Sequence, residues 1–372
     1  MLQDSLMDLA RCLAERGRCT VAPNPLVGAV VAREGSVVSE GWHSRAGGDH
    51  AEIVALSEAG EAARGATLYV TLEPCNHYGR TPPCVEAILR AGISRVVVGH
   101  LDPDPRMQGS SVGMLREAGV EVDVLDDPEF ERQNEQFVHH MRTGRPFVHL
   151  KLATTLDGRI AASGGDSRWV TGPDARLRAH ELRAEAGAVL VGANTVRTDD
   201  PMLTPRDLPV RAPRITRVVL DPRLTTSPES KLARSAREAP VVVFAPKPAL
   251  DGRKIELERL GVEVVATPLS GEGLDLFYVL DELGGRGIKG LLVEGGGETA
   301  TRFVRKGLAD KLTLFYAPKL LGSEGVPMIG ALRATKVAES LQFSVSEVEK
   351  VGDDVAVTLY PGGEEERVHR AC

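Results

Sequence analysis

The stretch "TLEPCNHYGRTPPC" (residues 71–84) decides how the first half of this 372-residue chain folds. It places Cys75 directly after an apolar, strand-like run and Cys84 directly after Pro82 and Pro83. Because proline is favoured in the first turn of a helix, we expect a helix to begin at Cys84. A thiol at that place has its thiolate stabilised by the helix dipole. The two cysteines could form a disulfide, remain idle thiols or supply two ligands to a metal.

The composition bears on the disulfide alternative. The chain has 5 cysteines, an early acidic N-terminus without a signal-like apolar core, and no apolar run long enough to cross a bilayer. We therefore expect a cytoplasmic protein with no membrane partner, and a reducing compartment disfavours disulfides. The net charge of -7 argues against a general nucleic-acid binder, although a local basic groove is still allowed.

A second motif upstream completes a candidate metal site. The segment "GGDHAEIVAL" (residues 47–56) puts His50 and Glu52 in the first turn of another predicted helix. One imidazole and two thiolates leave a fourth coordination position open, which distinguishes a catalytic zinc site from a structural one. A carboxylate beside the metal can take a proton from water and pass it to a leaving group. This pattern is typical of zinc deaminases, which usually separate the two cysteines by two residues rather than by "NHYGRTPP".

Two alternatives stay open at this point. His77 or His43 could supply a fourth ligand, which would make the zinc site structural rather than catalytic. Asn24 lies in "APNPLVG" (residues 22–28), where its amide could bond a substrate hydroxyl or carbonyl, or could simply belong to a turn between prolines.

Short apolar runs alternate with helical stretches along the whole chain, which predicts an α/β fold. In the first half we expect helices near residues 5–17, 50–60, 84–92 and 109–118, and strands at 26–35, 36–43, 66–72, 95–100 and 120–125. A Gly/Pro joint at residues 143–146 marks the expected domain boundary. In the second half we expect strands at 147–154, 188–193, 217–221, 241–245, 262–267 and 290–296, followed by a strand-rich end at 311–363.

The second half shows a weaker functional signal. In "LLVEGGGETATRFV" (residues 291–304) an apolar strand runs into a glycine triplet and then a helix, a place where backbone can approach a pyrophosphate. The triplet could also be an ordinary turn, and it is not the G-x-G-x-x-G pattern of a Rossmann unit. Arginine forks suit the phosphate of a sugar phosphate, and Arg183 and Arg206 are the candidates.

The whole chain resembles the family of bifunctional riboflavin-biosynthesis deaminase–reductases. The resemblance rests on segments that occur in family order: "PNPLVGAVV", "GWHSRAGGDHAE", "VTLEPCNHYGRTPPC", "LKLATTLDGRIA", "SRWVTG", "NTVRTDDPMLTPR", "VEGGGETA" and "APKLLG". The long spacing between the cysteines is typical of this family and argues against tRNA and cytidine deaminases.

For the first half the resemblance implies a cytidine-deaminase-like α/β/α sandwich at residues 1–144. This zinc-dependent pyrimidine deaminase domain would release ammonia from 2,5-diamino-6-(5-phosphoribosylamino)pyrimidin-4-one. One Zn²⁺ per chain would be held by His50, Cys75 and Cys84, and Glu52 would shuttle the proton. The candidates for contacts with the substrate ring or phosphate are Asn24, His43, His77 and Arg80.

For the second half the resemblance implies a dihydrofolate-reductase-like α/β domain at residues 145–372. It would use NADPH to reduce the ribosyl group of the deaminated product to ribityl, giving 5-amino-6-(5-phosphoribitylamino)uracil. The residues expected to hold NADPH are Ala153, Trp169, Thr195, Asp199, Gly295, Gly296 and Gly297. The residues expected to bind substrate are Ser167, Arg183, Leu203, Arg206 and Glu294.

The resemblance and the charges also bear on partners. We expect a small-molecule substrate, no nucleic acid, and a homo-oligomer whose interface uses the C-terminal strands. Asp199 and Asp200 would repel the 2′-phosphate of NADPH, so we expect them to face the nicotinamide ribose or the substrate. The competing hypotheses are a nucleoside or nucleic-acid deaminase fused to an unrelated domain, and a zinc-stabilised scaffold that binds nucleotide for regulation.

Overall fold

The computed structural model describes residues 2–78, 82–211, 213–247, 252–271 and 273–362. It divides into two compact units, Met1–Arg142 and Thr143–Cys372. Each unit is an α/β structure built around its own sheet, as the alternation of apolar runs predicts.

The first unit has a five-stranded sheet with the order β2-β1-β3-β4-β5. β1 pairs antiparallel with β2 and β3, while β3, β4 and β5 run parallel. The strands are β1 (Gly28–Arg33), β2 (Ser36–Trp42), β3 (Thr67–Leu72), β4 (Arg95–His100) and β5 (Glu121–Val124). The helices are α1 (Leu2–Glu15), α2 (Ala51–Ala59), α3 (Cys84–Ala91), α4 (Ser110–Glu117), α5 (Pro128–Gln133) and α6 (Glu135–Thr143), with a 3-10 turn η1 at Gly60–Ala63.

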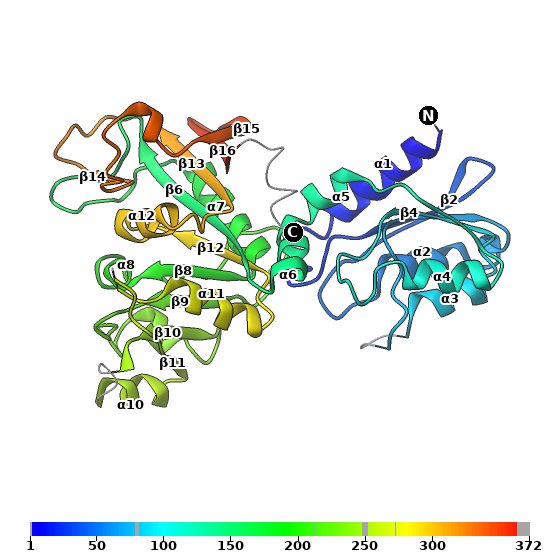
Figure 1. Cartoon of the computed structure of the whole chain (residues 1–372), viewed down its shortest axis with the longest axis horizontal. Coiled ribbons are helices and arrows are strands. Elements are labelled where there is room, and N and C mark those ends of the chain that lie inside the picture. Colours follow the sequence, from blue (N-terminus) through cyan, green and yellow to red (C-terminus); the bar gives the residue numbers. More distant parts are fainter. Residues whose placement is uncertain (1, 79–81, 212, 248–251, 272, 363–372) are drawn as a thin grey trace. The chain divides into compact units, whose positions relative to one another are not determined.

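Alternate residues of the strands build the two faces of this sheet. Ala29 and Val31 of β1 join a core cluster with α2, α3 and α4, whereas Val30 and Ala32 join a cluster with α1. The period of two in a strand sends successive side chains to opposite faces, so one helix layer covers each face. Figure 1 shows α1 on one side of the sheet and α2, α3 and α4 on the other. The α/β/α sandwich implied by the family resemblance is confirmed.

His100, at the end of β4, fastens the last helices of the first unit. Its Nε2 lies 3.3 Å from Glu131 Oε1 in α5, and Glu131 is also paired with Arg142 in α6. The imidazole stacks on Phe130 at 5.1 Å between ring centres, and its Nδ1 lies 2.6 Å from the carbonyl oxygen of Leu101. The hydrogen bond to Glu131, opposed by burial, raises the pKa of His100 above 6.5, and the same bond lowers the pKa of Glu131 to about 2.

These shifts predict a pH-dependent stability for the first unit. A raised pKa in the folded state means that His100 contributes stability below pH 6.5, and that this contribution is lost as the pH rises through the folded pKa. The contribution of Glu131 to stability does not change between about pH 6 and about pH 8. The pKa of Glu131 is about 2, so its carboxylate stays ionised throughout this range. The thermal midpoint of the wild type should therefore fall more between about pH 6 and about pH 8 than that of His100→Gln. Calorimetry on the full chain measures this difference, and parallel pH profiles for the two proteins would contradict it.

The second unit has a nine-stranded sheet with the order β11-β10-β9-β8-β12-β6-β13-β16-β15. The strands from β11 to β13 in that order are parallel, β16 is antiparallel to β13, and β15 is antiparallel to β16. They are β6 (Phe147–Thr155), β8 (Ala188–Gly192), β9 (Thr216–Leu220), β10 (Val241–Ala245), β11 (Val262–Ala266), β12 (Gly290–Glu294), β13 (Lys311–Ala317), β15 (Phe343–Val351) and β16 (Asp354–Pro361). A separate short pair is formed by β7 (Arg159–Ala161) and β14 (Val326–Pro327).

Helices cover both faces of this sheet. One core cluster packs α11 and α12 against alternate residues of the central strands, and the other packs α7, α8, α9 and α10 against the remaining ones. The helices are α7 (Pro173–Ala186), α8 (Ala193–Asp199), α9 (Lys231–Arg234), α10 (Gly252–Arg259), α11 (Leu276–Gly285) and α12 (Gly297–Arg305), with a 3-10 turn η3 at Val337–Glu339. In such sheets, ligands bind at the carboxyl ends of strands where the strand order reverses, here around β8, β12 and β6.

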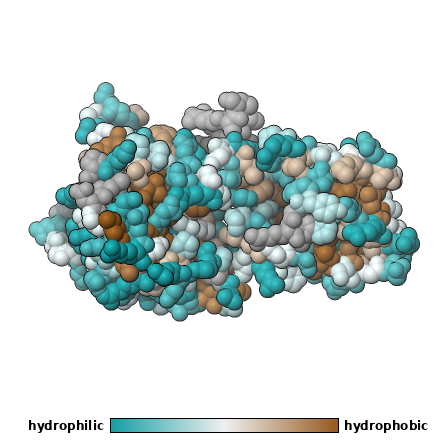
Figure 2. All heavy atoms as spheres, turned by 90° about the horizontal axis from the view of Figure 1, so that it is seen from below, coloured by the Kyte–Doolittle hydropathy of each residue, from teal (hydrophilic) through white to brown (hydrophobic). Residues whose placement is uncertain are grey.

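No helix among the described residues is both long and apolar enough to cross a membrane. On the face drawn in Figure 2, hydrophobic residues lie in areas interrupted by hydrophilic ones.

Candidate active sites

His50, Cys75 and Cys84 converge in the first unit. Their ligand atoms all lie within 4.8 Å of one another. His50 Nδ1 is 3.2 Å from Cys84 Sγ and 3.5 Å from Cys75 Sγ, so this ring nitrogen faces both sulfurs. The structure therefore brings together the three residues that the sequence selected as metal ligands.

The three ligand side chains are placed by two helix starts and by the loop after a strand. His50 is the N-cap residue of α2, Cys75 follows β3, and Cys84 is the first residue of α3, directly after the Pro83 cap. The helix that carries His50 can lie close to β2 because Gly41 has no side chain: a Cβ there would be 2.3 Å from the carbonyl oxygen of Ala51. The helix start predicted at Cys84 is thus observed.

The donor set fits zinc. Ligand atoms at about 2.0–2.3 Å from a tetrahedral zinc lie roughly 3.5–4 Å from each other, close to the spacing seen between the His50 nitrogen and the sulfurs. Without the metal, a hydrogen bond from Cys84 lowers the pKa of Cys75, and the same bond together with burial raises the pKa of Cys84. In the described part of the chain, this metal-capable group includes neither His43 nor His77, which disfavours the structural site with four protein ligands.

Glu52 is buried beside this group. It lies in the first turn of α2 and is only 3% exposed. Burial raises the pKa of Glu52, although the nearby His50 opposes the rise. A carboxyl group whose pKa is raised towards neutrality can both accept and donate a proton in one reaction cycle.

Asn24 and His43 form a linked pair next to the ligands. Asn24 Nδ2 lies 3.0 Å from His43 Nε2, and His43 Nδ1 lies 2.9 Å from the carbonyl oxygen of Asp49. The His43 ring meets the His50 ring edge-on, with centres 5.6 Å apart. Burial lowers the pKa of His43, so its neutral form is favoured. Both ring nitrogens of His43 are engaged within the protein, which suits a residue that holds Asn24 in place.

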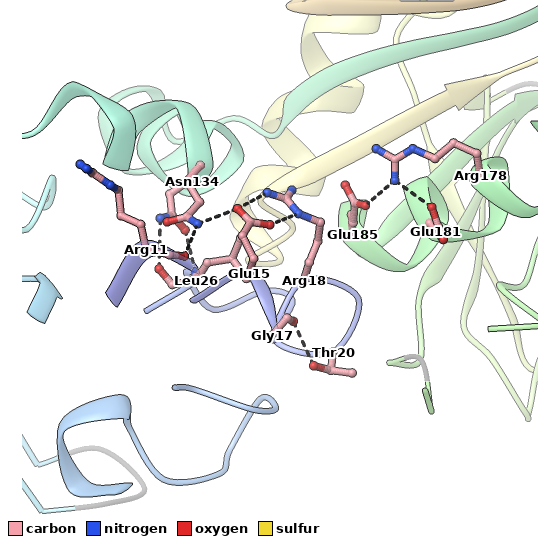
Figure 3. Close-up of polar contacts among 11 residues, drawn as sticks. Arg11, Glu15, Gly17, Arg18, Thr20, Leu26, Asn134, Arg178, Glu181 and Glu185 are labelled. Atoms are coloured by element: carbon pink, nitrogen blue, oxygen red, sulfur yellow. Dashed lines mark hydrogen bonds and ion pairs between the residues drawn. The ribbon is translucent and has the colours of Figure 1, made fainter. Parts of the chain in front are cut away.

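The segment that carries Asn24 is held by Asn134, the residue directly before α6. The backbone N–H of Leu26 donates to Asn134 Oδ1 at 2.7 Å, and Asn134 Nδ2 donates back to the carbonyl oxygen of Leu26 at 3.1 Å (Figure 3). Asn134 is buried, directly before α6. Of the other residues suggested for substrate contact, His77 is exposed and Arg80 lies outside the described residues.

In the second unit, Arg183 and Glu294 bind each other. Arg183 Nε and Nη2 donate to the two carboxylate oxygens of Glu294 at 2.6 and 2.7 Å. Arg183 comes from α7 and Glu294 ends β12, so the pair lies at the carboxyl edge of the sheet. Burial alone would raise the pKa of Glu294, but the facing guanidinium more than offsets it and lowers that pKa. The fork of Arg183, expected to bind phosphate, is occupied by Glu294 in this structure.

Lys151 is a charged residue that the sequence reasoning missed. It lies on β6 in register with Glu294 on the neighbouring strand β12. Burial lowers the pKa of Lys151, while the charge of Glu294 opposes this effect and that of Arg183 adds to it. The available signal was a lysine inside the otherwise apolar strand "FVHLKLAT". A cationic side chain in a buried strand is seldom retained without a partner or a role.

The glycine triplet lies against α8. Gly295 and Gly296 have φ values of 63° and 62°, which residues with a Cβ rarely adopt. A Cβ on Gly296 would lie 3.4 Å from Thr195 Oγ1. Gly297 starts α12, where a Cβ would lie 2.4 Å from the carbonyl oxygen of Pro327. Thr195 and the three glycines thus form one backbone-lined surface in front of a helix N-terminus.

The loop with Ser167 and Trp169 is held by cations. Lys319 Nζ donates to the carbonyl oxygens of Trp169 and Val170, both at 2.7 Å. Arg168 Nη2 donates to the carbonyl oxygen of Asp199 at 2.6 Å, which brings this loop to the end of α8. Trp169 is 61% exposed, and the centre of its ring lies 4.5 Å from the Arg176 guanidinium. An exposed aromatic ring on an anchored loop is available to a flat ligand.

The remaining expected residues of the second unit have the following surroundings. Ala153 pairs with Phe315 in the register between β6 and β13, and Leu203 is buried with a φ of 57°. Arg206 is exposed and lies 3.6 Å from Asp207. Asp200 accepts a hydrogen bond from the backbone N–H of Lys231 at 2.8 Å, so its carboxylate faces α9.

Comparisons with known proteins agree with the division of the chain into two units. Residues 2–100 match the family model described as the cytidine and deoxycytidylate deaminase zinc-binding region, and residues 146–357 match the RibD C-terminal domain. The chain is 45% identical over 358 residues to the riboflavin biosynthesis protein RibD of Aquifex aeolicus, covering 96% of this chain and 98% of that protein. It is 40% identical to the protein of the same name from Escherichia coli, covering 96% of this chain and 99% of the relative.

Solved structures of RibD proteins are also similar to the chain over almost its whole length. A structure of Acinetobacter baumannii RibD superposes with a TM-score of 0.89 at 37% identity, covering 97% of this chain and 99% of that one. A Thermotoga maritima diaminohydroxyphosphoribosylaminopyrimidine deaminase/5-amino-6-(5-phosphoribosylamino)uracil reductase superposes with a TM-score of 0.84 at 37% identity, again over 97% and 99% of the two chains.

Proposed function

The chain belongs to the RibD family of riboflavin-biosynthesis proteins, and we propose from this membership which of its residues perform each reaction. It is a bifunctional deaminase and reductase that acts on a small molecule and uses zinc and NADPH. We assign the deaminase to the first unit and the reductase to the second. The domain limits suggested by the sequence, 1–144 and 145–372, stay a prediction.

The deaminase step uses the cluster around His50. His50, Cys75 and Cys84 would hold the zinc, which supplies a Lewis acid that makes a water molecule nucleophilic near neutral pH. Water adds to C2 of 2,5-diamino-6-(5-phosphoribosylamino)pyrimidin-4-one, the carbon that carries the 2-amino group. During this addition Glu52 takes up a proton from the water and passes it to the departing nitrogen. A C=O bond replaces the C–N bond and ammonia leaves. Asn24, oriented by His43, would bond the substrate.

The observation that carries this proposal is the convergence of the three donor atoms within 4.8 Å beside a buried Glu52. A scaffold would need the zinc ligands but would have no use for a carboxyl group whose pKa burial has raised. The geometry therefore favours catalysis over the zinc-stabilised scaffold.

The reductase step uses the carboxyl edge of the second sheet. Thr195, Gly295–Gly297 and Trp169 would hold NADPH, which would supply a hydride for C1′ of the ribosyl group in its open, imine form. The imine nitrogen gains a proton as C1′ gains the hydride, which gives a ribitylamine. We assign Glu294 to stabilise the positive charge on that nitrogen, and Lys151, whose pKa burial lowers, to donate the proton. Arg183 keeps Glu294 ionised.

Metal removal separates the two reactions. The wild-type chain is given the phosphoribosylated diaminopyrimidinone, and ammonia and NADPH absorbance are followed together before and after a chelator strips the zinc. We expect ammonia release to stop on chelation and to return with added Zn²⁺, while NADPH consumption with the deaminated compound continues. Ammonia release that survives complete zinc removal would overturn the deaminase assignment. NADPH consumption before ammonia release would reverse the order of the steps.

We also propose that two copies of the chain associate through the C-terminal strands. β15 is the edge strand of the sheet, and its N–H and C=O groups on the outer side have no strand partner among the described residues. Val345 and Val348 on this strand are 60% and 62% exposed. An open edge with exposed valines favours pairing with an identical edge by two-fold symmetry.

If two copies associate through β15, replacing an exposed residue of this strand should lower the mass of the particle in solution. Val348→Lys places a charge on the exposed edge and should convert an oligomer into a monomer in size-exclusion chromatography with light scattering. Val37→Lys is the matched control, since Val37 is another exposed strand valine, on β2 of the first unit. A wild type that elutes as a monomer, or a Val348→Lys variant with wild-type mass, would exclude this interface.

A further inference from the structure

Glu73 is a buried carboxylate that faces backbone N–H groups. It follows β3 directly and is 5% exposed. Its Oε2 accepts hydrogen bonds from the N–H groups of Asp102 at 3.1 Å and Gly109 at 2.8 Å. Its Oε1 accepts from those of Ser111 at 2.9 Å and Val112 at 3.3 Å. These four donors replace the hydration that the carboxylate loses on burial.

Three of the four donors belong to the start of α4. The first N–H groups of a helix have no acceptor within the helix, and the N-cap residue here, Gly109, has no side chain to supply one. Glu73 therefore caps α4 from another part of the chain. The negative charge also complements the positive end of the helix dipole.

A second bond ties the same loop to the same turn. Asn76 Nδ2 donates to Ser110 Oγ at 2.7 Å. Glu73 and Asn76 flank Pro74 and Cys75, so residues on both sides of the zinc ligand are fastened to the first turn of α4. On its other side, Cys75 faces α3, because its carbonyl oxygen accepts from the N–H of Val85 at 3.2 Å and its Sγ from the N–H of Cys84 at 3.3 Å.

We propose that Glu73 is a positioning residue for the deaminase: by capping α4 it holds the Pro74–Cys75 turn so that the Cys75 sulfur meets His50 Nδ1 and the Cys84 sulfur. This inference rests on the zinc site proposed above. The four hydrogen bonds of Glu73 all come from backbone N–H groups, so it acts on the metal ligand through the backbone. Hydrogen-bonded groups behind metal ligands commonly change metal affinity or activity by about 10- to 100-fold when they are replaced.

The test compares Glu73→Gln with a matched helix cap elsewhere in the same unit. Glutamine keeps the size of the side chain but replaces one acceptor oxygen by an NH₂ group that faces backbone N–H donors. The control is Asp127→Asn, which neutralises the buried carboxylate that caps α5 and accepts from the N–H of Glu129 at 3.0 Å. Both variants should lower the thermal midpoint of the full chain, because each loses a charged cap.

The readout that separates positioning from stability is the metal site itself. Zinc affinity is measured by competition with a chelator, and the cobalt(II)-substituted protein reports thiolate ligation through its visible spectrum. We expect Glu73→Gln to bind zinc about 10- to 100-fold more weakly and to show an altered cobalt spectrum, while Asp127→Asn keeps both wild-type properties. A cooperative thermal transition of the full chain shows that each variant is folded, and NADPH consumption with the deaminated compound shows that the second unit is unaffected.

Each outcome has a definite meaning. A Glu73→Gln protein with wild-type zinc affinity and cobalt spectrum overturns the positioning role, whatever its thermal midpoint. If Glu73→Gln does not fold, Asn76→Ala removes the second tie and should weaken zinc binding in the same direction; unchanged binding there also overturns the inference. A wild type without thiolate bands in its cobalt spectrum defeats the zinc site itself, which is the failure of the proposed function.

Discussion

Replacing Glu52 by glutamine should abolish ammonia release while one zinc per chain stays bound. Glutamine has nearly the same size, so the buried site around residue 52 keeps its packing. It cannot take a proton from water or pass one to the departing nitrogen, and the loss of such a group costs about 10²- to 10⁴-fold in rate. Ammonia production and metal content, measured on the same preparation, check both parts of the result.

The control for this substitution lies on the same helix. Glu58→Gln changes an exposed carboxylate of α2 and should leave ammonia release unchanged. Both variants should still consume NADPH when they are given the deaminated compound, because the reductase lies in the other unit. Ammonia release by Glu52→Gln at the wild-type rate would exclude Glu52 as the residue that carries the proton.

The metal cluster could be predicted from sequence because each ligand stands at a local structural signal. His50 and Cys84 come at helix starts, and Cys75 comes three residues after the last residue of β3. Such boundaries depend on neighbouring residues, on glycine and proline above all, and parallel strands beside helices place their carboxyl ends at one edge. The α/β class follows for the same reason, since the apolar runs have the length and spacing of buried strands.

The pairing of Arg183 with Glu294 could not be predicted in that way. The two residues are 111 positions apart and meet only because β12 is inserted between β8 and β6. Lys151 was missed for the same reason, since its position opposite Glu294 depends on the register of two strands that are distant in sequence. Strand order is set by the packing of the whole sheet, and a local pattern carries no information about it.

The contacts of Asp200 and Glu73 show a second reason why the roles of some residues could not be predicted from the sequence. From sequence, Asp200 was expected to face the cofactor ribose or the substrate, yet its carboxylate binds the backbone at the start of α9. Glu73 was part of the motif but was given no role, and its four donors lie 29 to 39 residues away. Carboxylates readily bond exposed N–H groups, so an acidic residue beside a motif has structural uses that compete with functional ones.

Replacing Glu294 by glutamine should slow NADPH consumption by about 10²- to 10³-fold, as expected when a preorganised group that stabilises transition-state charge is removed. The carboxylate of Glu294 is held ionised by Arg183 and lies in register with Lys151. Glutamine keeps an oxygen for the Arg183 fork but has no charge to offer the imine nitrogen. NADPH oxidation with the deaminated compound, measured at saturating cofactor, gives the change in kcat.

Stability must be separated from chemistry in this variant, because Glu294→Gln leaves the buried Arg183 without an anionic partner and lowers the stability of the second unit. Rates are therefore compared well below the thermal midpoint, and ammonia release serves as the internal control because it belongs to the first unit. Glu298→Gln is the matched variant, since Glu298 lies four residues further on, exposed in the first turn of α12. If Glu294→Gln and Glu298→Gln oxidise NADPH at the same rate, Glu294 only supports the fold, and the charge that assists the reduction must come from another residue.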